Sequence, residues 1–260
     1  MLDMGFKPQI NRILKHVPQQ RQTMLFSATM PREIFALATS EMQLPLRIEV
    51  APAGTAATKV DQELIIVRQE NKSTLLLSLL KEIHGSVLVF SRTKHGAKKL
   101  TRSLNAEGHR AAEIHANRSL GQRREALEGF KKGKYRVLVA TDIAARGIDV
   151  VDIAVVINYD LPNDPSDYIH RIGRTGRAGR AGNAISFATP SQTRDVRSIE
   201  QFTSASLRRR SVASLPEAVF ERQDTQRSAR VPRQKRGGSF PSRSKRPISR
   251  RKTNQRRRRK

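Results

Sequence analysis

The sequence Val87-Leu88-Val89-Phe90-Ser91 decides the fold class, because it is an unbroken run of large apolar residues that ends in a polar one. Such a run is typical of a strand that is buried on both faces of a parallel sheet. On either side of it, Leu75–Ile83 and Ala97–Ala106 have the spacing of helices with one apolar face. The region therefore predicts a helix, a buried strand and a second helix.

The same alternation continues along the chain in both directions. Five further strands are expected, at Glu63–Arg68, Ala111–His115, Arg136–Thr141, Ala154–Asn158 and Ala184–Ala188. Further helices are expected at Gln122–Phe130, Tyr168–Ile172 and Thr193–Phe202. This order predicts an α/β domain with a parallel sheet covered on both faces. Because ligands of such sheets bind beyond the carboxyl ends of the strands, the loops after Phe90, Thr141 and Tyr159 are expected to form one functional edge.

The first fifty residues have a separate pattern. Phe6–Val17 and a stretch that begins near Pro31 predict two helices, while Thr23–Phe26 and Leu46–Val50 predict two short strands. The following residues, 51–58, are small and rich in Ala, Thr, Gly and Pro, which is typical of a linker.

The composition points to a polyanionic partner. The chain has 260 residues, with 50 Lys and Arg against 23 Asp and Glu, and a formal net charge of +27. Such a charge repels itself unless phosphate groups or counterions offset it, so nucleic acid is the expected partner. The absence of cysteine excludes disulfides, thiolate zinc sites and cysteine nucleophiles. The apolar runs are far shorter than the roughly 20 residues that span a bilayer, so we expect no membrane association and a cytoplasmic protein.

Much of this charge lies near the end of the sequence. Leu207 to Lys260 contains 20 Lys and Arg but only three acids, together with few large apolar residues. We therefore predict a disordered basic tail, which cannot bury enough apolar surface to fold. It either keeps the protein in solution or binds RNA phosphates, and its density of arginine favours RNA.

Two segments have the residue types of a ligand site. Ala140–Asp149 (ATDIAARGID) follows a strand and places a cation, an unhindered backbone and a carboxylate close together, although Asp142 alone would be explained as a helix cap. His170–Arg180 (HRIGRTGRAGR) has four arginines at a spacing of three, interleaved with glycines. Such a set of guanidinium groups suits a phosphoryl group, but a solvated basic turn would explain the arginines equally well.

Together these segments resemble a known family. Ser27-Ala28-Thr29, Val87–Lys94 (VLVFSRTK), ATDIAARGID and HRIGRTGR occur in the order and approximate spacing of the later motifs of DEAD-box RNA helicases, with most similarity to the bacterial RhlE-like branch. The resemblance extends from Met1 to about Phe202. It implies that residues 1–50 are the end of a first RecA-like domain, 51–59 a linker, 60–205 a second RecA-like domain and 206–260 the tail.

The resemblance also implies roles for individual residues, with ATP as the cofactor and RNA as the partner. Arg174 and Arg177 would act as arginine fingers on the nucleotide phosphates, and Gly147 and Asp149 would complete the nucleotide site. The RNA backbone would be bound by Thr93, Lys94, Arg123 and Thr141. Coupling between the two domains would depend on Ser27, Thr29, Arg146 and His170.

Two parts of the family's catalytic site are absent from the sequence. There is no G-x-x-x-x-G-K-[ST] loop, since the nearest candidate, Lys72-Ser73, lacks the glycines, and there is no Asp-Glu-Ala-Asp box. The Mg²⁺ that accompanies ATP would be held by residues outside this sequence, and we assign no metal ligands within it. Our hypothesis is that the chain alone does not hydrolyse ATP and that a separate N-terminal helicase half is a partner. Ribosomal or mRNA-decay assemblies are further candidate partners.

The sequence departs from the family pattern at two positions. Ala116 follows His115 where the family has glycine, and Leu120 stands where it has glutamine. These changes affect either RNA positioning or local packing.

Two hypotheses thus follow from the sequence. The first is the C-terminal part of an ATP-dependent RNA helicase, which uses ATP to open RNA duplexes locally. The second is a non-enzymatic RNA-binding or assembly protein that uses one RecA-like domain and a basic tail. A basic structural protein of the ribosome would explain the charge but not the two motifs.

Overall fold

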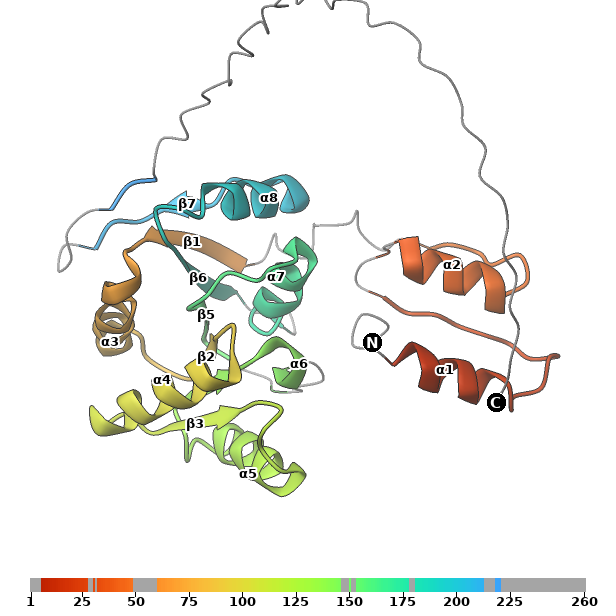
Figure 1. Ribbon diagram of the computed structural model, residues 1–260, viewed down its shortest axis with the longest axis horizontal. Coiled ribbons are helices and arrows are strands. Elements are labelled where there is room, and N and C mark those ends of the chain that lie inside the picture. Colours follow the sequence, from red (N-terminus) through yellow and green to blue (C-terminus); the bar gives the residue numbers. More distant parts are fainter. Residues whose placement is uncertain are drawn as a thin grey trace, which may run out of the picture. The chain divides into compact units, whose positions relative to one another are not determined.

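A computed structural model of the protein describes residues 6–27, 30, 32–48, 60–145, 150, 153–177, 181–212 and 218–220 (Figure 1). Residues 6–48 and residues 60–212 are two separate parts of the chain. None of the helices in the described ranges is long and apolar enough to cross a membrane.

A seven-stranded sheet forms the centre of residues 60–212, and all of its neighbouring strands pair in parallel in the order β3-β4-β2-β5-β6-β1-β7. The strands are β1 (Val60–Ile66), β2 (Val87–Phe90), β3 (Ala111–Ile114), β4 (Val137–Ala140), β5 (Val155–Asn158), β6 (Gly182–Ala188) and β7 (Arg208–Arg209). The α/β fold and the six strands predicted within residues 60–205 are confirmed.

Helices connect these strands. They are η3 (Gln69–Asn71), α3 (Lys72–Glu82), α4 (Lys94–Ala106), α5 (Leu120–Lys131), α6 (Asp142–Ala145), α7 (Pro165–Ile172) and α8 (Thr193–Thr203). The five helices expected in this part of the sequence are all present.

The helices cover both faces of the sheet, because successive strand residues point to opposite sides. Val87 and Val89 of β2 belong to a core with leucines of α3 and α4. Leu88 and Phe90 point the other way, into a core with α5. On that same face, Leu64 of β1 joins residues of α7 and α8. The strands are therefore buried from both sides, as the continuous Val and Leu runs predict.

Polar side chains cap the beginnings of α4, α5 and α7. The Thr93 hydroxyl accepts a hydrogen bond from the Gly96 backbone N–H at 2.9 Å and caps α4. Ser119 and Gln122 form a reciprocal capping box at the start of α5. Caps of this kind satisfy backbone N–H groups that have no partner within the helix. Since α4 follows β2 and α5 follows β3, both capped helix starts lie toward the carboxyl edge of the sheet.

The folded domain extends further than the sequence predicts. Arg208 and Arg209 pair with Glu63 and Leu64 of β1, and Leu207 is buried. Arg210 holds this edge through an ion pair of 3.0 Å to Glu63. The assignment of residues 207–212 to the disordered tail is thus wrong, because they are part of the sheet and its surroundings. The rest of the predicted tail, apart from residues 218–220, lies outside the described residues.

Residues 6–48 contain α1 (Lys7–Leu14) and α2 (Arg32–Glu41), which agree with the two predicted helices. The two predicted strands are wrong where they are described, because residues 23–26 and 46–48 form no strand. Most of their apolar side chains are exposed, and Phe26 is 88% exposed. A strand needs a neighbour for its backbone groups, and no described segment pairs with either stretch.

Candidate functional site

The predicted RNA-binding residues gather at one edge of the sheet. Thr93 and Lys94 follow β2, Arg123 lies in the first turn of the helix after β3, and Thr141 follows β4. Since β3, β4 and β2 are parallel neighbours, these four residues share the carboxyl edge. The Lys94 ammonium group donates to the Asn117 side-chain oxygen at 3.1 Å, which joins the loops after β2 and β3. The structure thus brings these residues together, and their roles remain predictions.

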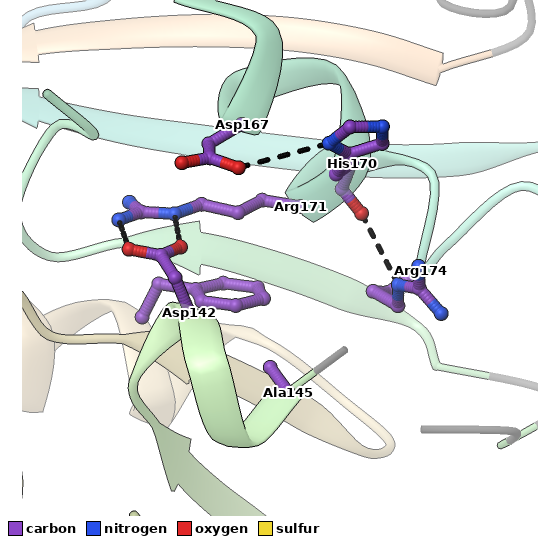
Figure 2. Close-up of a pocket in the computed structure, with 7 residues that line it drawn as sticks. Asp142, Ala145, Asp167, His170, Arg171 and Arg174 are labelled. Atoms are coloured by element: carbon purple, nitrogen blue, oxygen red, sulfur yellow. Dashed lines mark hydrogen bonds and ion pairs between the residues drawn. The ribbon is translucent and has the colours of Figure 1, made fainter. Parts of the chain in front are cut away.

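A buried ion pair links this edge to α7. The Arg171 guanidinium donates to both carboxylate oxygens of Asp142, at 2.5 Å and 2.8 Å (Figure 2). It also donates to the Asp160 backbone oxygen at 2.6 Å and lies 4.9 Å from the centre of the Phe90 ring. Arg171 is only 2% exposed. The expectation that all four arginines of the motif suit a phosphoryl group is therefore wrong for Arg171, which is a structural residue.

A second buried charge supports the end of β5. The Lys72 ammonium group donates to the Asp160 carboxylate at 2.9 Å and to the Tyr159 backbone oxygen at 2.8 Å. The other Asp160 carboxylate oxygen accepts from the Arg92 backbone N–H at 3.1 Å. Burial raises the pKa of the Tyr159 hydroxyl, whose ring lies beside Lys72. Lys72, the nearest match to a phosphate-binding lysine in the sequence, thus has a structural role.

Arg174 and Arg177 have a different environment from Arg171. Each donates its Nε–H to the backbone oxygen four residues earlier, Arg174 to His170 at 3.1 Å and Arg177 to Gly173 at 2.9 Å. These bonds satisfy carbonyl groups at the end of α7 and fix the direction of both side chains. Both arginines line one pocket, together with Ile153, Ala154, Thr175, Gly176 and Ala181.

The turn that carries these arginines is held in place by its neighbours. The buried Thr175 hydroxyl donates to the Ile153 backbone oxygen at 2.6 Å. Gly176 has a φ of +67°, and a Cβ there would lie 3.0 Å from the Val60 side chain. A side chain at this position would be strained and crowded, so glycine keeps the turn close to β1.

His170 lies next to the ion pair, in a shallow pocket that Arg174 also lines (Figure 2). Its Nδ1 is 3.7 Å from the Asp167 carboxylate. The predicted role of His170 and Ser27 in coupling the two domains stays a prediction, because Ser27 belongs to the separately described residues 6–48. Thr29, Arg146, Gly147 and Asp149, the remaining predicted site residues, lie outside the described residues. Within the described ranges, no three His, Asp or Glu side chains are grouped so that they could hold a metal ion.

Sequence reasoning missed a buried cluster at the end of β3. Glu113 and His115 are both buried, and Arg118 donates to the Glu113 carboxylate. The His115 Nε2 is 3.7 Å from that carboxylate, and neither ring nitrogen has a hydrogen-bond partner among the described residues. Burial lowers the pKa of His115, opposed by the charge of Glu113 and assisted by those of Arg118 and Lys98. The only signal in the sequence was the departure at Ala116, which follows His115.

This cluster predicts a loss of stability in acid. The pKa of His115 in the folded chain lies below its ordinary value, so the unfolded chain binds more protons as the pH falls below about 6.5. Acidification from neutral pH should therefore lower the free energy of unfolding, and His115→Gln should reduce that loss. Denaturant unfolding at neutral and at acidic pH measures the free energy of unfolding of each protein. The exposed His84 provides the comparison, and equal behaviour of His115→Gln and His84→Gln would contradict the prediction.

Comparisons with known proteins agree with this architecture. A family model for the helicase conserved C-terminal domain matches residues 71–179, and one for DEAD/DEAH box helicases matches residues 1–37. ATP-dependent RNA helicase DbpA of Bacillus subtilis is 43% identical over 78% of this chain and 42% of its own length. DEAD-box ATP-dependent RNA helicase CshA of Geobacillus kaustophilus is 40% identical over 84% of this chain and 47% of its own length. The chain thus spans less than half the length of these curated relatives.

Solved structures give the same result. The structure of S. cerevisiae Dbp5 bound to RNA and ADP BeF3 matches with a TM-score of 0.73 and 31% identity, over 79% of this chain and 55% of that one. E. coli DEAD-box protein SrmB, bound to regulator of ribonuclease activity A, matches with a TM-score of 0.59 and 32% identity, over 62% of this chain and 98% of that one. The assignment to the RhlE-like branch remains a prediction. The parallel sheet of residues 60–212 is a RecA-like fold, and the chain belongs to the DEAD-box RNA helicase family, of which it carries the helicase C-terminal domain.

Proposed function

We propose that this chain supplies the C-terminal half of an ATP-dependent RNA helicase. The observation that carries the proposal is the ion pair between Asp142 and Arg171. It joins the segment that begins at Thr141, which we assign to RNA, to α7. This helix carries His170, which we assign to coupling between the domains, and it is followed by Arg174, which we assign to the nucleotide. A movement of α7 that follows nucleotide binding is thereby connected to the RNA edge through a buried, charged contact.

The RNA edge has the chemistry of a phosphate-binding surface. Lys94 and Arg123 are cations, and Thr93 and Thr141 carry hydroxyl groups, so all four side chains are able to donate hydrogen bonds to phosphate oxygens. None of these groups distinguishes one base from another, so binding is expected to depend little on RNA sequence. The likeness to Dbp5, whose structure contains RNA, supports this assignment.

The nucleotide side would use Arg174 and Arg177. Their guanidinium groups are planar donors that match phosphate oxygens, and they line a single pocket at the end of α7. ATP, with Mg²⁺, would supply the phosphoryl group that is transferred to water. Arginines near that group stabilise its developing negative charge, while the phosphate loop and the metal ligands that the reaction also needs are not in this sequence. This chain would therefore supply the arginines of a nucleotide site whose phosphate loop and metal ligands belong to another lobe.

An ATPase assay with a separately supplied lobe tests the proposal. The purified chain is expected to hydrolyse no ATP by itself. Addition of the N-terminal RecA-like lobe of a related DEAD-box helicase, which contains the phosphate loop and the Asp-Glu-Ala-Asp box, should produce hydrolysis that RNA stimulates.

The controls separate this function from simple RNA binding. The lobe without this chain, and this chain without the lobe, measure the background rates. RNA-stimulated hydrolysis by the chain alone would refute the hypothesis that it needs a partner lobe. RNA binding without any restored hydrolysis, with lobes from several relatives, would favour the non-enzymatic RNA-binding protein instead.

A further inference from the structure

The outer face of α4 is basic along most of its length. Four cations, all exposed, project from the helix: Lys94, Lys98, Lys99 and Arg102. The opposite face is buried in the core and consists of Ala97, Leu100, Thr101 and Leu104. Among the helices of the described residues 60–212, α4 is the one that has bases but no Asp or Glu. Only Lys94 of these residues is accounted for by the proposed RNA edge.

These charges reduce the stability of the free helix. Lys98 is four residues from both Lys94 and Arg102, a spacing at which like charges on a helix repel. The first turn of α4 has no acid and the last turn has no base, so neither end has the charge that the helix dipole favours. By contrast, α5 pairs Lys131 with Glu128 at 3.8 Å. No ion pair to Lys98, Lys99 or Arg102 occurs within the described part of the chain.

The basic face continues directly from the RNA edge. α4 begins at Lys94, whose ammonium group contacts Asn117 in the loop after β3, and the helix packs against β3 and β4 (Figure 1). Its 13 residues extend about 20 Å at 1.5 Å per residue. Lys98 is close enough to the cluster at the end of β3 for its charge to act on His115. Lys94, Lys98 and Arg102 therefore form one row that leads away from the carboxyl edge.

We propose that the basic face of α4, formed by Lys98, Lys99 and Arg102, binds the continuation of the RNA strand that leaves the carboxyl edge at Lys94. The inference rests on the proposed RNA-binding function. RNA is the occupant that complements a row of like charges, because its phosphates repeat along the strand and neutralise the repulsion within the helix. The face has no Phe, Tyr or Trp, and the imidazole of the exposed His95 is its one ring on which a base could stack, so the contact is mainly to the backbone.

Charge reversal within the full chain tests this inference. Lys98→Glu combined with Lys99→Glu should weaken binding of an RNA of about 20 nucleotides by about tenfold or more at about 0.1 M salt, and flatten the slope of log affinity against log salt by about 1.4. An RNA of about 4 nucleotides, the lower end of single-strand site sizes, reaches only the carboxyl edge and should lose less than about twofold. The matched control is Lys131→Glu with Lys132→Glu, which changes the net charge equally at the other end of the strands.

Thermal unfolding separates a binding face from a structural one. A glutamate introduced at position 98 would face Lys94 and Arg102 and replace two repulsions by attractions, so the free variant should unfold at the same or a higher temperature than the parent. Lys98→Gln with Lys99→Gln removes the charges without adding new ones, and should give a smaller loss of affinity in the same direction. Equal affinity of the α4 variants and the Lys131 and Lys132 control for the longer RNA would overturn the inference.

Because the sequence has no cysteine, a single one can be labelled uniquely. A photoreactive group on Lys99→Cys should cross-link to the longer RNA, whereas the same group on Lys132→Cys should not; equal yields would also overturn the inference. Arg123→Ala with Thr141→Ala tests the proposed RNA edge independently. Loss of binding of both RNAs in that variant supports the edge, and its outcome does not depend on that of the α4 variants.

Discussion

Replacement of Asp142 by alanine should lower the free energy of unfolding by about 3 kcal/mol, the lower end of the range for breaking a buried ion pair, because Asp142 keeps some exposure to water. The variant would leave the Arg171 guanidinium, which is 2% exposed, without its charge partner. The remaining contacts of Arg171, to the Asp160 backbone oxygen and the Asn158 side chain, do not neutralise its charge. Denaturant unfolding of the two proteins at neutral pH measures the difference.

Two further variants show whether the effect comes from an uncompensated buried charge. Asp61 pairs with Arg208 at 3.1 Å, but both side chains are more than half exposed, so Asp61→Ala should cost less than about 1 kcal/mol. Asp142→Ala combined with Arg171→Met removes both charges and should recover much of the lost stability. If Asp142→Ala cost no more than Asp61→Ala, the ion pair would not be the structural link that we describe.

The second large effect is expected at Arg174. In the reconstituted enzyme, Arg174→Ala should reduce the rate of ATP hydrolysis by about 10³-fold to 10⁵-fold, the range for loss of an arginine that stabilises a transferring phosphoryl group. Arg174→Lys keeps the positive charge but loses the planar pair of donors, so it should restore only part of the rate. Single-turnover hydrolysis with saturating RNA measures the chemical step.

The matched control for Arg174 is Arg197, an exposed arginine on α8 far from the pocket residues in sequence. Arg197→Ala should hydrolyse ATP at the parent rate. Nucleotide binding and thermal unfolding of Arg174→Ala are measured beside the rate, so that an effect on the chemical step is separated from an effect on binding or stability. A rate for Arg174→Ala equal to that of Arg197→Ala would exclude its role on the nucleotide.

The sequence predicts the central sheet well because burial on both faces leaves a direct trace in it. β2, β4 and β5 are almost wholly Val, Ile and Leu, so each is visible as a continuous run. β7 has no such trace. Arg208 and Arg209 are exposed and charged, and they form a strand only because the buried Leu207 and the distant Glu63 hold them at the edge of β1. Contacts between residues so far apart in the sequence cannot be inferred from the local sequence pattern.

The strands predicted in residues 6–48 show the opposite error. Thr23–Phe26 has a strand-like composition, but the described chain gives it no neighbour, so the pattern does not become a strand. The local sequence pattern shows which secondary structure a segment favours, whereas the pairing of a strand depends on the segments that lie beside it.

The sequence predicts the residues of the site in outline, but it does not predict the polar contacts that hold the surrounding elements together. The motifs place Thr93 and Thr141 after parallel strands, at the carboxyl edge, whereas Arg174 lies in the turn that follows α7. Spacing alone could not show that Arg171 turns into the core while Arg174 does not. The partner of Arg171 lies 29 residues away, and that of Lys72 lies 88 residues away. Polar networks that cross between elements are therefore found only with the structure.

The short strand β7 has a practical consequence for anyone who shortens this protein. A form that ends at Ala205 would remove Leu207 and the three arginines after it, and would leave the backbone groups of Glu63 and Leu64 uncovered. An exposed strand of this kind is a template for pairing with other molecules, so such a form would be prone to aggregate for reasons unrelated to RNA. A cut after Phe220 would keep the cover and remove only the residues beyond it.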